Sequence, residues 1–368
     1  MTRLESLGWN SFFQQQLNPD SSLAPARVFE EQRGRYRLEW EGGASFATLA
    51  GRLRHDAEGD PAALPCVGDW VLARLPDGIS RAADAIPVPD GAVIHRVLER
   101  KSRFSRQDPG RRTAEQVVAA NVDTVFLVQS LNRDFNVRRL ERYLALLWES
   151  GAEPVIVLSK ADLRPDAARE RAAVERAAPG VAIHAVSSVT PDGLAPLSAY
   201  LSAGRTVALV GSSGVGKSTI VNRLAGEELI RVREIREDDD RGRHTTTSRR
   251  IVLLPSGGML LDTPGMRAVI LWEGEEGLAQ AFEDVESIAA GCRFRDCKHE
   301  SEPGCAVRAA LEDGSLDSGR YASYGKLQRE ARHQAMKTDH RLRMQEQQKW
   351  RRIHMEARRR PDKRGRFG

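Results

Sequence analysis

The chain has 368 residues, of which 40% are hydrophobic and 29% charged, a composition typical of a globular protein with an apolar core. This length predicts two or three domains rather than one. The N-terminal segment lacks a basic stretch followed by an apolar run and a cleavage site, which argues against secretion. No apolar run reaches the roughly 18 residues that span a bilayer. We therefore expect a cytoplasmic protein, monomeric and without a membrane partner.

Charge is distributed unevenly along the chain. Residues 326–368 contain 15 Lys/Arg and 5 Asp/Glu, a net charge of +10, so residues 1–325 carry −5 of the total of +5. A basic tail on an acidic body favours a polyanionic partner. A solvated helix without any partner would have the same composition. Because the tail is rich in Arg, Gln, Glu and Met and has no proline before Pro361, we expect it to be helical.

The N-terminal third of the chain has the pattern of a small β domain. Residues 1–34 show no clear periodicity, and we assign them to a leader. Residues 35–105 contain short β-like runs separated by Gly, Pro and Asp, at 36–40, 67–72 and 92–97. Several short strands without a helical period predict a β-barrel of the OB kind, a fold that often binds RNA.

A basic segment follows the last of these runs. Between His95 and Arg112 the chain has seven Lys/Arg against two acidic residues, with Phe104 among them. An aromatic side chain in a basic groove is suited to stacking on nucleic-acid bases. A basic linker between domains would give the same pattern, so the sequence leaves both interpretations open.

Residues 106–272 alternate between strand and helix patterns. Strands are predicted at 122–128, 154–158, 181–186 and 206–210, and helices from 137, at 166–178, at 194–201 and from 218. Two further strands, 251–254 and 259–261, flank the hairpin turn Pro255-Ser256-Gly257-Gly258. This alternation predicts an α/β domain with a largely parallel sheet.

A complete phosphate-binding loop follows the strand at 206–210. Its residues are Gly211, Ser212, Ser213, Gly214, Val215, Gly216, Lys217 and Ser218, with Thr219 in the helix that they open. Glycines let backbone N–H groups surround phosphates, and the helix N-terminus favours negative charge. We expect Lys217 to reach the β- and γ-phosphates and the Ser218 hydroxyl to hold Mg²⁺. A Gly/Ser-rich turn arising by chance is the alternative.

Two further segments complete a nucleotide site. Asp262-Thr263-Pro264-Gly265 ends the strand at 259–261, where Asp262 supports Mg²⁺ and the Gly265 N–H senses a γ-phosphate. Before it lies Arg241-Gly242-Arg243-His244-Thr245-Thr246-Thr247, and we expect Thr246 to complete the Mg²⁺ shell. An ordinary polar loop is the alternative for this second segment.

The predicted base-recognition element precedes the phosphate loop. Ser159, Lys160, Ala161 and Asp162 follow the strand at 154–158. The Asp162 carboxylate can accept hydrogen bonds from guanine N1–H and N2–H₂, a donor pair that adenine lacks, and the Lys160 stem can cover the ring. Ser187 and Ser188 end the next strand, where a small polar loop would close on the base. Together the two segments predict GTP and GDP as ligands.

Three cysteines and a histidine form a compact cluster after this domain. The spacing is Cys292-x4-Cys297-x-His299-x5-Cys305. Three thiolates and one imidazole make a closed tetrahedral set, which suits one structural Zn²⁺ rather than a catalytic ion with an open position. Reduced cysteines that happen to lie close together are the alternative. Cys66 stands alone and is expected to be a small core residue.

The order of these motifs is circularly permuted, since small GTPases ordinarily begin with the phosphate loop and end with base recognition. The sequence resembles the bacterial ribosome small-subunit-dependent GTPase A family, on the permuted order, the Gly-Arg-His-Thr-Thr-Thr switch and the metal cluster. The resemblance covers roughly residues 35–325. It implies an OB-like barrel at 35–105, a permuted GTPase domain at 106–272 and a helical zinc-binding domain at 273–325. The basic tail at 326–368, inferred from its charge, follows these domains.

The resemblance also implies a function and a partner. Members act in late maturation of the small ribosomal subunit, so this chain is expected to bind that subunit and its rRNA and to hydrolyse GTP at a low intrinsic rate that the subunit raises. The sequence departs from the family at Ser159, because guanine loops generally begin with Asn; looser guanine specificity is one expected result.

A methionine takes a position important for hydrolysis. Met266 follows Gly265 where many GTPases have a water-orienting Gln, and a thioether cannot position water. In the resembling family the switch histidine is assigned this role, here His244. Two alternatives remain: an RNA-binding module gated by nucleotide, in which hydrolysis is incidental, and a permuted GTPase of large-subunit assembly.

Overall fold

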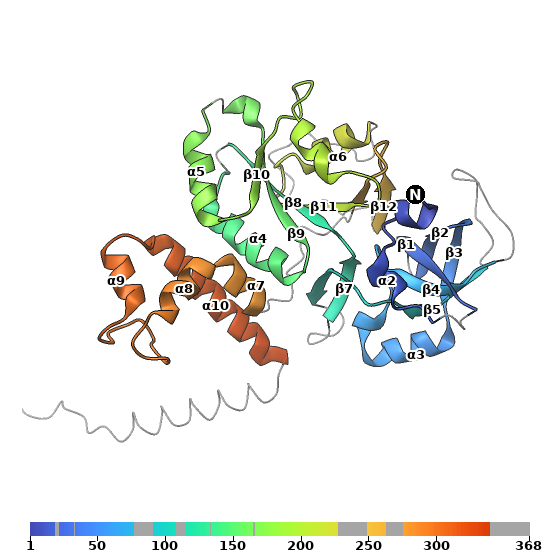
Figure 1. Cartoon of the computed structure of the whole chain (residues 1–368), viewed down its shortest axis with the longest axis horizontal. Coiled ribbons are helices and arrows are strands. Elements are labelled where there is room, and N and C mark those ends of the chain that lie inside the picture. Colours follow the sequence, from blue (N-terminus) through green and yellow to red (C-terminus); the bar gives the residue numbers. More distant parts are fainter. Residues whose placement is uncertain are drawn as a thin grey trace, which may run out of the picture.

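The computed structural model describes residues 1–18, 22–32, 34–76, 91–107, 115–132, 134–164, 166–226, 249–262 and 275–338. Strands of a barrel and of an α/β core follow one another across the molecule, and a helical module lies at the far side of the core (Figure 1). None of the described helices has both the length and the apolar character needed to cross a membrane.

Five strands close an N-terminal barrel. In chain order they are β1 (Ala24–Gln32), β2 (Arg35–Trp40), β3 (Gly43–Leu49), β4 (Trp70–Arg74) and β5 (Ala92–Val97). Each pairs with its neighbours in the order β1-β2-β3-β5-β4, and β4 returns to β1. The barrel predicted from the sequence is therefore confirmed. Its strands β1 and β3 and the helix α3 (Gly51–Gly59) were not predicted.

The predicted leader, residues 1–34, instead contains ordered elements. Two short helices, α1 (Arg3–Ser6) and α2 (Ser11–Gln14), precede β1, which is an integral strand of the barrel. Leu7 and Phe13 are buried, and the Phe13 ring lies 5.8 Å from that of Trp70. The segment lacks a clear period because its helices have only four residues each, and of these residues only Phe13 of α2 is buried.

A two-stranded sheet connects the barrel to the α/β core. Its strands are β6 (Arg103–Gln107) and β7 (Glu115–Ala120), which pair antiparallel. The domain boundary expected between residues 105 and 106 therefore falls inside β6. Phe104, which the sequence analysis considered for base stacking, is fully buried in the main core and cannot stack on a ligand.

The core sheet has five parallel strands in the order β10-β9-β8-β11-β13. They are β8 (Thr124–Ser130), β9 (Glu153–Ser159), β10 (Ala182–Ala185), β11 (Thr206–Val210) and β13 (Met259–Asp262). The strand β12 (Arg249–Leu253) pairs antiparallel with β13 and also with β1, so core and barrel form one sheet of 11 strands. All seven residues of β8 are buried, as expected for a parallel strand covered on both faces.

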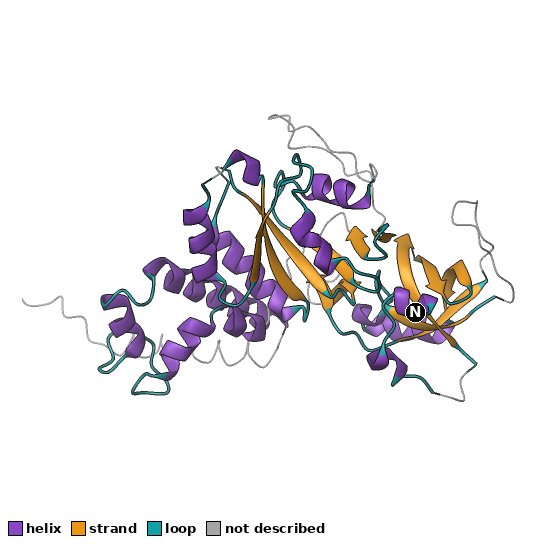
Figure 2. Ribbon diagram, turned by 45° about the horizontal axis from the view of Figure 1, so that its top comes forward, coloured by secondary structure: helices purple, strands orange, loops and turns teal. Residues whose placement is uncertain are grey.

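Helices cover both faces of this sheet (Figure 2). Val125 and Leu127 of β8 belong to the core that includes α4 (Val137–Glu149) and α5 (Ala168–Ala177). Phe126 and Val128 face the opposite side, with α6 (Lys217–Ala225) and the 3₁₀ helix η3 (Ala195–Tyr200). The helix predicted at 194–201 is thus a 3₁₀ helix, which Pro196 permits near its first turn.

A helical module packs on the α4 side of the core. It contains α7 (Glu275–Ala281), α8 (Glu283–Ala290), α9 (Ala306–Glu312) and α10 (Ser318–Thr338). The predicted helical tail is confirmed as far as Thr338, but the helix begins before residue 326, and residues 339–368 lie outside the described part of the chain. Arg320 at the start of α10 is buried and bonds to groups of four other segments, Asp284, Glu141 and the carbonyls of Ala177 and Ala281.

A second buried arginine joins the barrel to the core. Arg27 of β1 is 1% exposed, and burial lowers its pKa to about 10, so it stays charged at neutral pH. Its guanidinium donates to the Thr206 hydroxyl at 2.9 Å and to the carbonyls of Leu7, Gly68 and Asn121. Because a buried guanidinium needs all these acceptors, the N-terminal segment, the barrel and β11 are held together.

Candidate nucleotide and metal sites

The predicted nucleotide motifs lie at one edge of the core sheet. The phosphate loop follows β11, the base-recognition segment follows β9, and Ser187 and Ser188 follow β10. These three strands are parallel members of the same sheet, so their carboxyl ends meet at this edge. The structure therefore brings together segments that the sequence separates by up to about 60 residues.

Glycines determine the shape of the phosphate loop. Gly211 has a φ of 149°, and a Cβ placed there would lie 2.2 Å from the Val128 carbonyl oxygen. Gly214 and Gly216 have positive φ values of 77° and 98°, and Gly216 is the N-cap of α6. A side chain at Gly211 would force the loop away from β8, and one at the other two positions would strain the backbone.

The loop lies directly before a helix N-terminus and carries a cation. Lys217 is the first residue of α6, and its Nζ donates to the carbonyls of Gly211, at 2.7 Å, and Ser212. Ser218 and Thr219 are half-buried in the same first turn. An ammonium group, a helix N-terminus and glycine-rich backbone at one place form a strong anion-binding arrangement.

The base-recognition segment is attached to the phosphate loop by two side chains. The hydroxyl of Ser159, which is 2% exposed, donates to the Val215 carbonyl at 2.6 Å. Lys160 has a left-handed backbone, φ 59°, and its Nζ donates to the Gly214 carbonyl at 2.9 Å. The segment that would bind the base and the loop that would bind phosphate therefore form one unit.

The next strand orients the acidic residue of this segment. The exposed Asp162 accepts a hydrogen bond of 2.6 Å from the buried Ser187 hydroxyl. The Ala161 N–H donates to the Val186 carbonyl at 3.0 Å, and Ser188 is half-buried beside it. The Ser187 hydroxyl thus holds one carboxylate oxygen of Asp162, while the Asp162 side chain is exposed and open to a ligand.

Part of the predicted site lies outside the described residues. His244, Thr246 and Gly265 belong to it, and so does the side chain of Asp262. The backbone of Asp262 ends β13 opposite Arg250 of β12, and β13 is the direct neighbour of β11. The predicted position of Asp262 at the end of a strand beside the phosphate loop is therefore observed, while its role stays a prediction.

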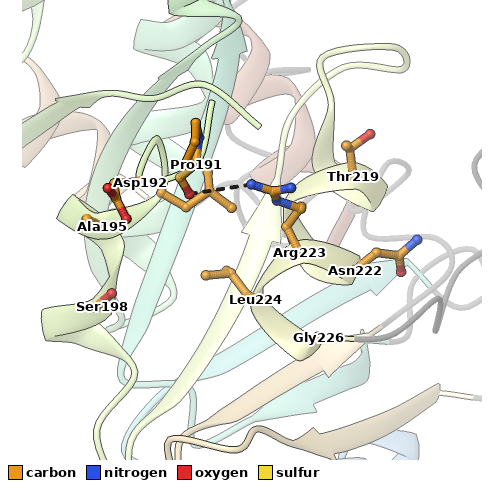
Figure 3. Close-up of a pocket in the computed structure, with 10 residues that line it drawn as sticks. Pro191, Asp192, Ala195, Ser198, Thr219, Asn222, Arg223, Leu224 and Gly226 are labelled. Atoms are coloured by element: carbon orange, nitrogen blue, oxygen red, sulfur yellow. Dashed lines mark hydrogen bonds between the residues drawn. The ribbon is translucent and has the colours of Figure 1, made fainter. Parts of the chain in front are cut away.

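A cavity of about 850 Å³ opens between η3 and α6 (Figure 3). Its walls include Pro191, Asp192 and Ser198 on one side and Thr219, Asn222 and Arg223 on the other. Arg223 spans them by donating to the Thr190 carbonyl at 3.1 Å. The sequence does not predict this cavity, because its walls come from the turn before η3, from η3 and from α6, which share no motif. Only Thr219 also belongs to the predicted phosphate site.

The predicted metal ligands converge in the helical module. The ligand atoms of Cys292, Cys297, His299 and Cys305 all lie within 4.8 Å of one another. The His299 Nδ1 lies 3.5 Å and 3.4 Å from the sulfurs of Cys292 and Cys305, which are 3.9 Å apart. Tetrahedral zinc with ordinary bond lengths requires separations of about 3.5–3.8 Å. The cluster could therefore hold a metal ion.

The loop between these ligands is shaped by its own hydrogen bonds. The Glu302 carboxylate accepts the backbone N–H groups of Lys298, Glu300 and Ser301, each at 3.0 Å. These bonds, the Lys298 N–H first, lower the pKa of Glu302 to about 2. His299 has a left-handed backbone, φ 61°. The carboxylate thus organises the turn that brings the His299 ring to the three sulfurs.

Comparison with known proteins agrees with this architecture. The RsgA GTPase family model matches residues 97–272. The small ribosomal subunit biogenesis GTPase RsgA of Opitutus terrae is 46% identical over 368 residues, covering 99% of both chains. The chain belongs to the RsgA GTPase family. It is therefore a GTPase, a hydrolase, and the family resemblance found in its sequence is confirmed.

Other relatives extend the match to solved structures. A protein of the same name from Streptomyces avermitilis is 42% identical over 98% of this chain and 95% of its own. YjeQ from Thermotoga maritima is 26% identical with a TM-score of 0.61, covering 84% of this chain and 98% of its own. YloQ, a circularly permuted GTPase, shares the fold, with a TM-score of 0.60 at 23% identity over 86% of this chain and 98% of its own. The permuted fold is thereby confirmed.

Ser159 offers a test of the connection between the two loops. Replacing it with Ala removes the hydroxyl that bonds to Val215 and leaves that carbonyl without this donor, a loss of about 1.4 kcal/mol. We expect GDP and GTP to bind about tenfold more weakly, measured by fluorescence titration. The preference for GTP over ATP should not change, because Ser159 is too buried to touch the base.

The matched control is Ser256→Ala, which removes a hydroxyl that donates to the Leu201 carbonyl at 2.7 Å outside the predicted nucleotide site, and it should leave nucleotide affinity unchanged. A Ser159→Ala protein that bound both nucleotides normally would show that the connection is dispensable. A changed ratio of GTP to ATP affinity would show that Ser159 contacts the base.

Proposed function

We propose that this GTPase acts, as a monomer in the cytoplasm, on the small ribosomal subunit and its rRNA during late subunit maturation. It hydrolyses GTP to GDP and phosphate at a low intrinsic rate that the subunit increases. The observation that carries this proposal is the match to proteins named small ribosomal subunit biogenesis GTPases over 99% of both chains in one case. That match includes the barrel and the metal cluster as well as the GTPase core.

The arrangement of loops at the sheet edge supports one nucleotide site in which different segments bind the phosphates, the base and Mg²⁺. Phosphates bind along Gly211–Thr219, with Lys217 supplying the positive charge at the β- and γ-phosphates. The guanine edge is read by Asp162, with Ser159, Lys160, Ala161, Ser187 and Ser188 shaping the base pocket. Ser218, Thr246 and Asp262 hold Mg²⁺, which offsets the charge that develops on the phosphates, and the Gly265 N–H senses the γ-phosphate.

Hydrolysis needs a group that orients the attacking water. Met266 cannot do this, because its thioether is only a weak acceptor. His244 lies in the segment between α6 and β12 and is the proposed catalytic residue. Its ring can accept a proton or hydrogen bond from water when the subunit places it near the γ-phosphate. The protein by itself therefore hydrolyses GTP slowly, and the protein bound to the subunit hydrolyses it fast.

The barrel supports an RNA partner. The Arg35 guanidinium lies over the Phe46 ring, 5.0 Å from its centroid, on neighbouring strands β2 and β3. Arg37 of β2 is half-exposed and stands opposite Phe46 in the register. The Arg37 guanidinium is paired with Glu39 at 2.9 Å, so Arg35 and the Phe46 ring are the groups suited to bind a nucleic-acid strand, by a phosphate contact and by stacking.

We also propose that the metal is a single structural Zn²⁺. Four protein ligands leave no open position, so the ion stabilises the loop between Cys292 and Cys305 and takes no part in hydrolysis. Elemental analysis of purified protein should find one zinc per chain, and Cys305→Ser should lose it and lower the melting temperature. Cys66→Ser is the matched control and should keep the metal. A wild-type protein free of zinc would contradict this assignment.

The function itself is tested by steady-state GTP hydrolysis with and without purified small ribosomal subunits. We expect small subunits to raise turnover by about a hundredfold or more, and large subunits and ATP to give no such increase. His244→Ala should lose this increase while GTP affinity stays near the wild-type value, because the residue orients water rather than nucleotide.

The alternatives make different predictions in this assay. Stimulation by large subunits alone would indicate a role in large-subunit assembly. Tight GTP-dependent binding to small subunits without turnover would indicate an RNA-binding module in which hydrolysis is incidental. Undiminished stimulation in His244→Ala would remove that residue from the mechanism.

A further inference from the structure

The barrel strand β1 has two different partners along one edge. Its first part, Ala24–Arg27, pairs with β4 and closes the barrel. Its last part pairs with β12, Glu30 opposite Arg250 and Glu31 opposite Arg249. The strand therefore leaves the barrel edge and joins the GTPase core within a few residues.

An irregularity in β1 makes this change of partner possible. The register with β2 shifts between Val28 and Glu30, so Phe29 is an extra residue in the strand. Phe29 is 2% exposed and lies in the main core with Met259 and Leu261 of β13. A bulge bends the strand that carries it. Here it turns one aromatic side chain into the interface and presents the next two residues to β12.

The contact between β1 and β12 depends on charge. In the described part of the two strands, two residue pairs face each other, and they place two glutamates against two arginines. The Arg249 Nη1 lies 3.2 Å from the Glu31 Oε2, and the two side chains are 16% and 25% exposed. This half-buried ion pair therefore adds a charged side-chain contact to the backbone pairing of β1 with β12.

The ion pair stands next to the predicted catalytic segment in the sequence. Arg249 follows Thr246 by three residues and His244 by five. Five residues span at most about 17 Å, so the position of Arg249 limits where His244 can be. On the other side, Arg250 stands opposite Asp262, the end of the strand beside the phosphate loop. A contact that fixes Arg249 therefore constrains two parts of the proposed hydrolytic site: the segment before Arg249, which contains His244, and the pairing of Arg250 with Asp262.

We propose that Glu31 and Arg249 are a positioning pair for hydrolysis. Through this pair the barrel, held on RNA, fixes β12, the strand that follows the proposed catalytic segment in the sequence. This inference rests on the proposed function, and it assigns the transmission of subunit binding to β1 and β12. Neither residue needs to touch RNA or nucleotide.

A charge-exchange experiment tests the pair. Glu31→Lys and Arg249→Glu each place like charges side by side, and the double variant restores an ion pair with reversed orientation. We expect each single variant to lose about three- to tenfold of the subunit-stimulated GTP turnover and the double variant to recover most of it. Basal turnover and GTP affinity should stay within about twofold in all three.

The control is the same exchange at Arg171 and Glu175, an exposed pair on α5 with a separation of 2.9 Å, which should change none of these quantities. Hydrogen exchange at the amides of residues 249–253 gives a second readout. It should be faster in both single variants and return toward wild type in the double variant, with or without subunits. If either single variant folds poorly, Glu31→Gln and Arg249→Gln replace them.

Unchanged stimulation in both single variants, despite faster exchange, would overturn the role in hydrolysis. Unchanged exchange would overturn the contact itself. A double variant that stays as defective as the single variants would show that one of the residues contacts the subunit directly, which also overturns the proposal. Wild-type protein that small subunits do not stimulate would contradict the proposed function instead, and the exchange measurement would still decide whether the pair holds β12.

Discussion

The parallel pairing of β9, β8, β11 and β13 is the constraint on which the rest of the structure depends. Neighbouring parallel strands end at the same edge, whatever their order along the chain. The phosphate loop after β11 and the base-recognition segment after β9 therefore meet, although the second precedes the first in sequence. Circular permutation leaves the site intact because strand neighbours, rather than chain order, bring its loops together.

Two buried arginines attach the flanking parts to this sheet. Arg27 joins the barrel and the N-terminal segment to β11, the strand that leads into the phosphate loop. Arg320 joins α10 to α4 and α5, the helices beside the base-recognition strands. The barrel is thus connected to the phosphate side of the core and the metal module to the base side.

The sequence was most informative where chemistry restricts the choice of residue. The phosphate loop, Asp162 and the four metal ligands could be singled out because phosphate, guanine and a tetrahedral ion each require particular groups at fixed spacing. The structure brings the four metal ligands together, and the roles of all these residues stay predictions. Cys66 is buried beside Asp69, as predicted for a lone core cysteine, and burial raises the pKa of its thiol. The core strands β8, β9 and β11 were also predictable, because each is buried on both faces and reads as an apolar run.

Other features depend on contacts that no local pattern encodes. The segment of α1 and α2 has structure because Leu7 and Phe13 pack on residues far along the chain. The sequence places Phe104 among basic residues, where it could have stacked on a nucleic-acid base, but its side chain is fully buried in the main core. The pairing of β1 with β12 joins residues about 220 positions apart, and Ser159 reaches Val215 across 56 positions. Such contacts follow from the fold as a whole.

We propose that the permuted segments form one guanine-nucleotide site in which Asp162 reads the base. The most direct measurement compares GTP and XTP hydrolysis by Asp162→Asn and wild-type protein, with small subunits present. Xanthine has a carbonyl where guanine has its 2-amino group, so an amide donor suits it and a carboxylate does not. We expect Asp162→Asn to lose about a thousandfold in kcat/KM for GTP and to gain activity on XTP. A variant that still prefers GTP would contradict this proposal, because it would show that Asp162 does not recognise the base.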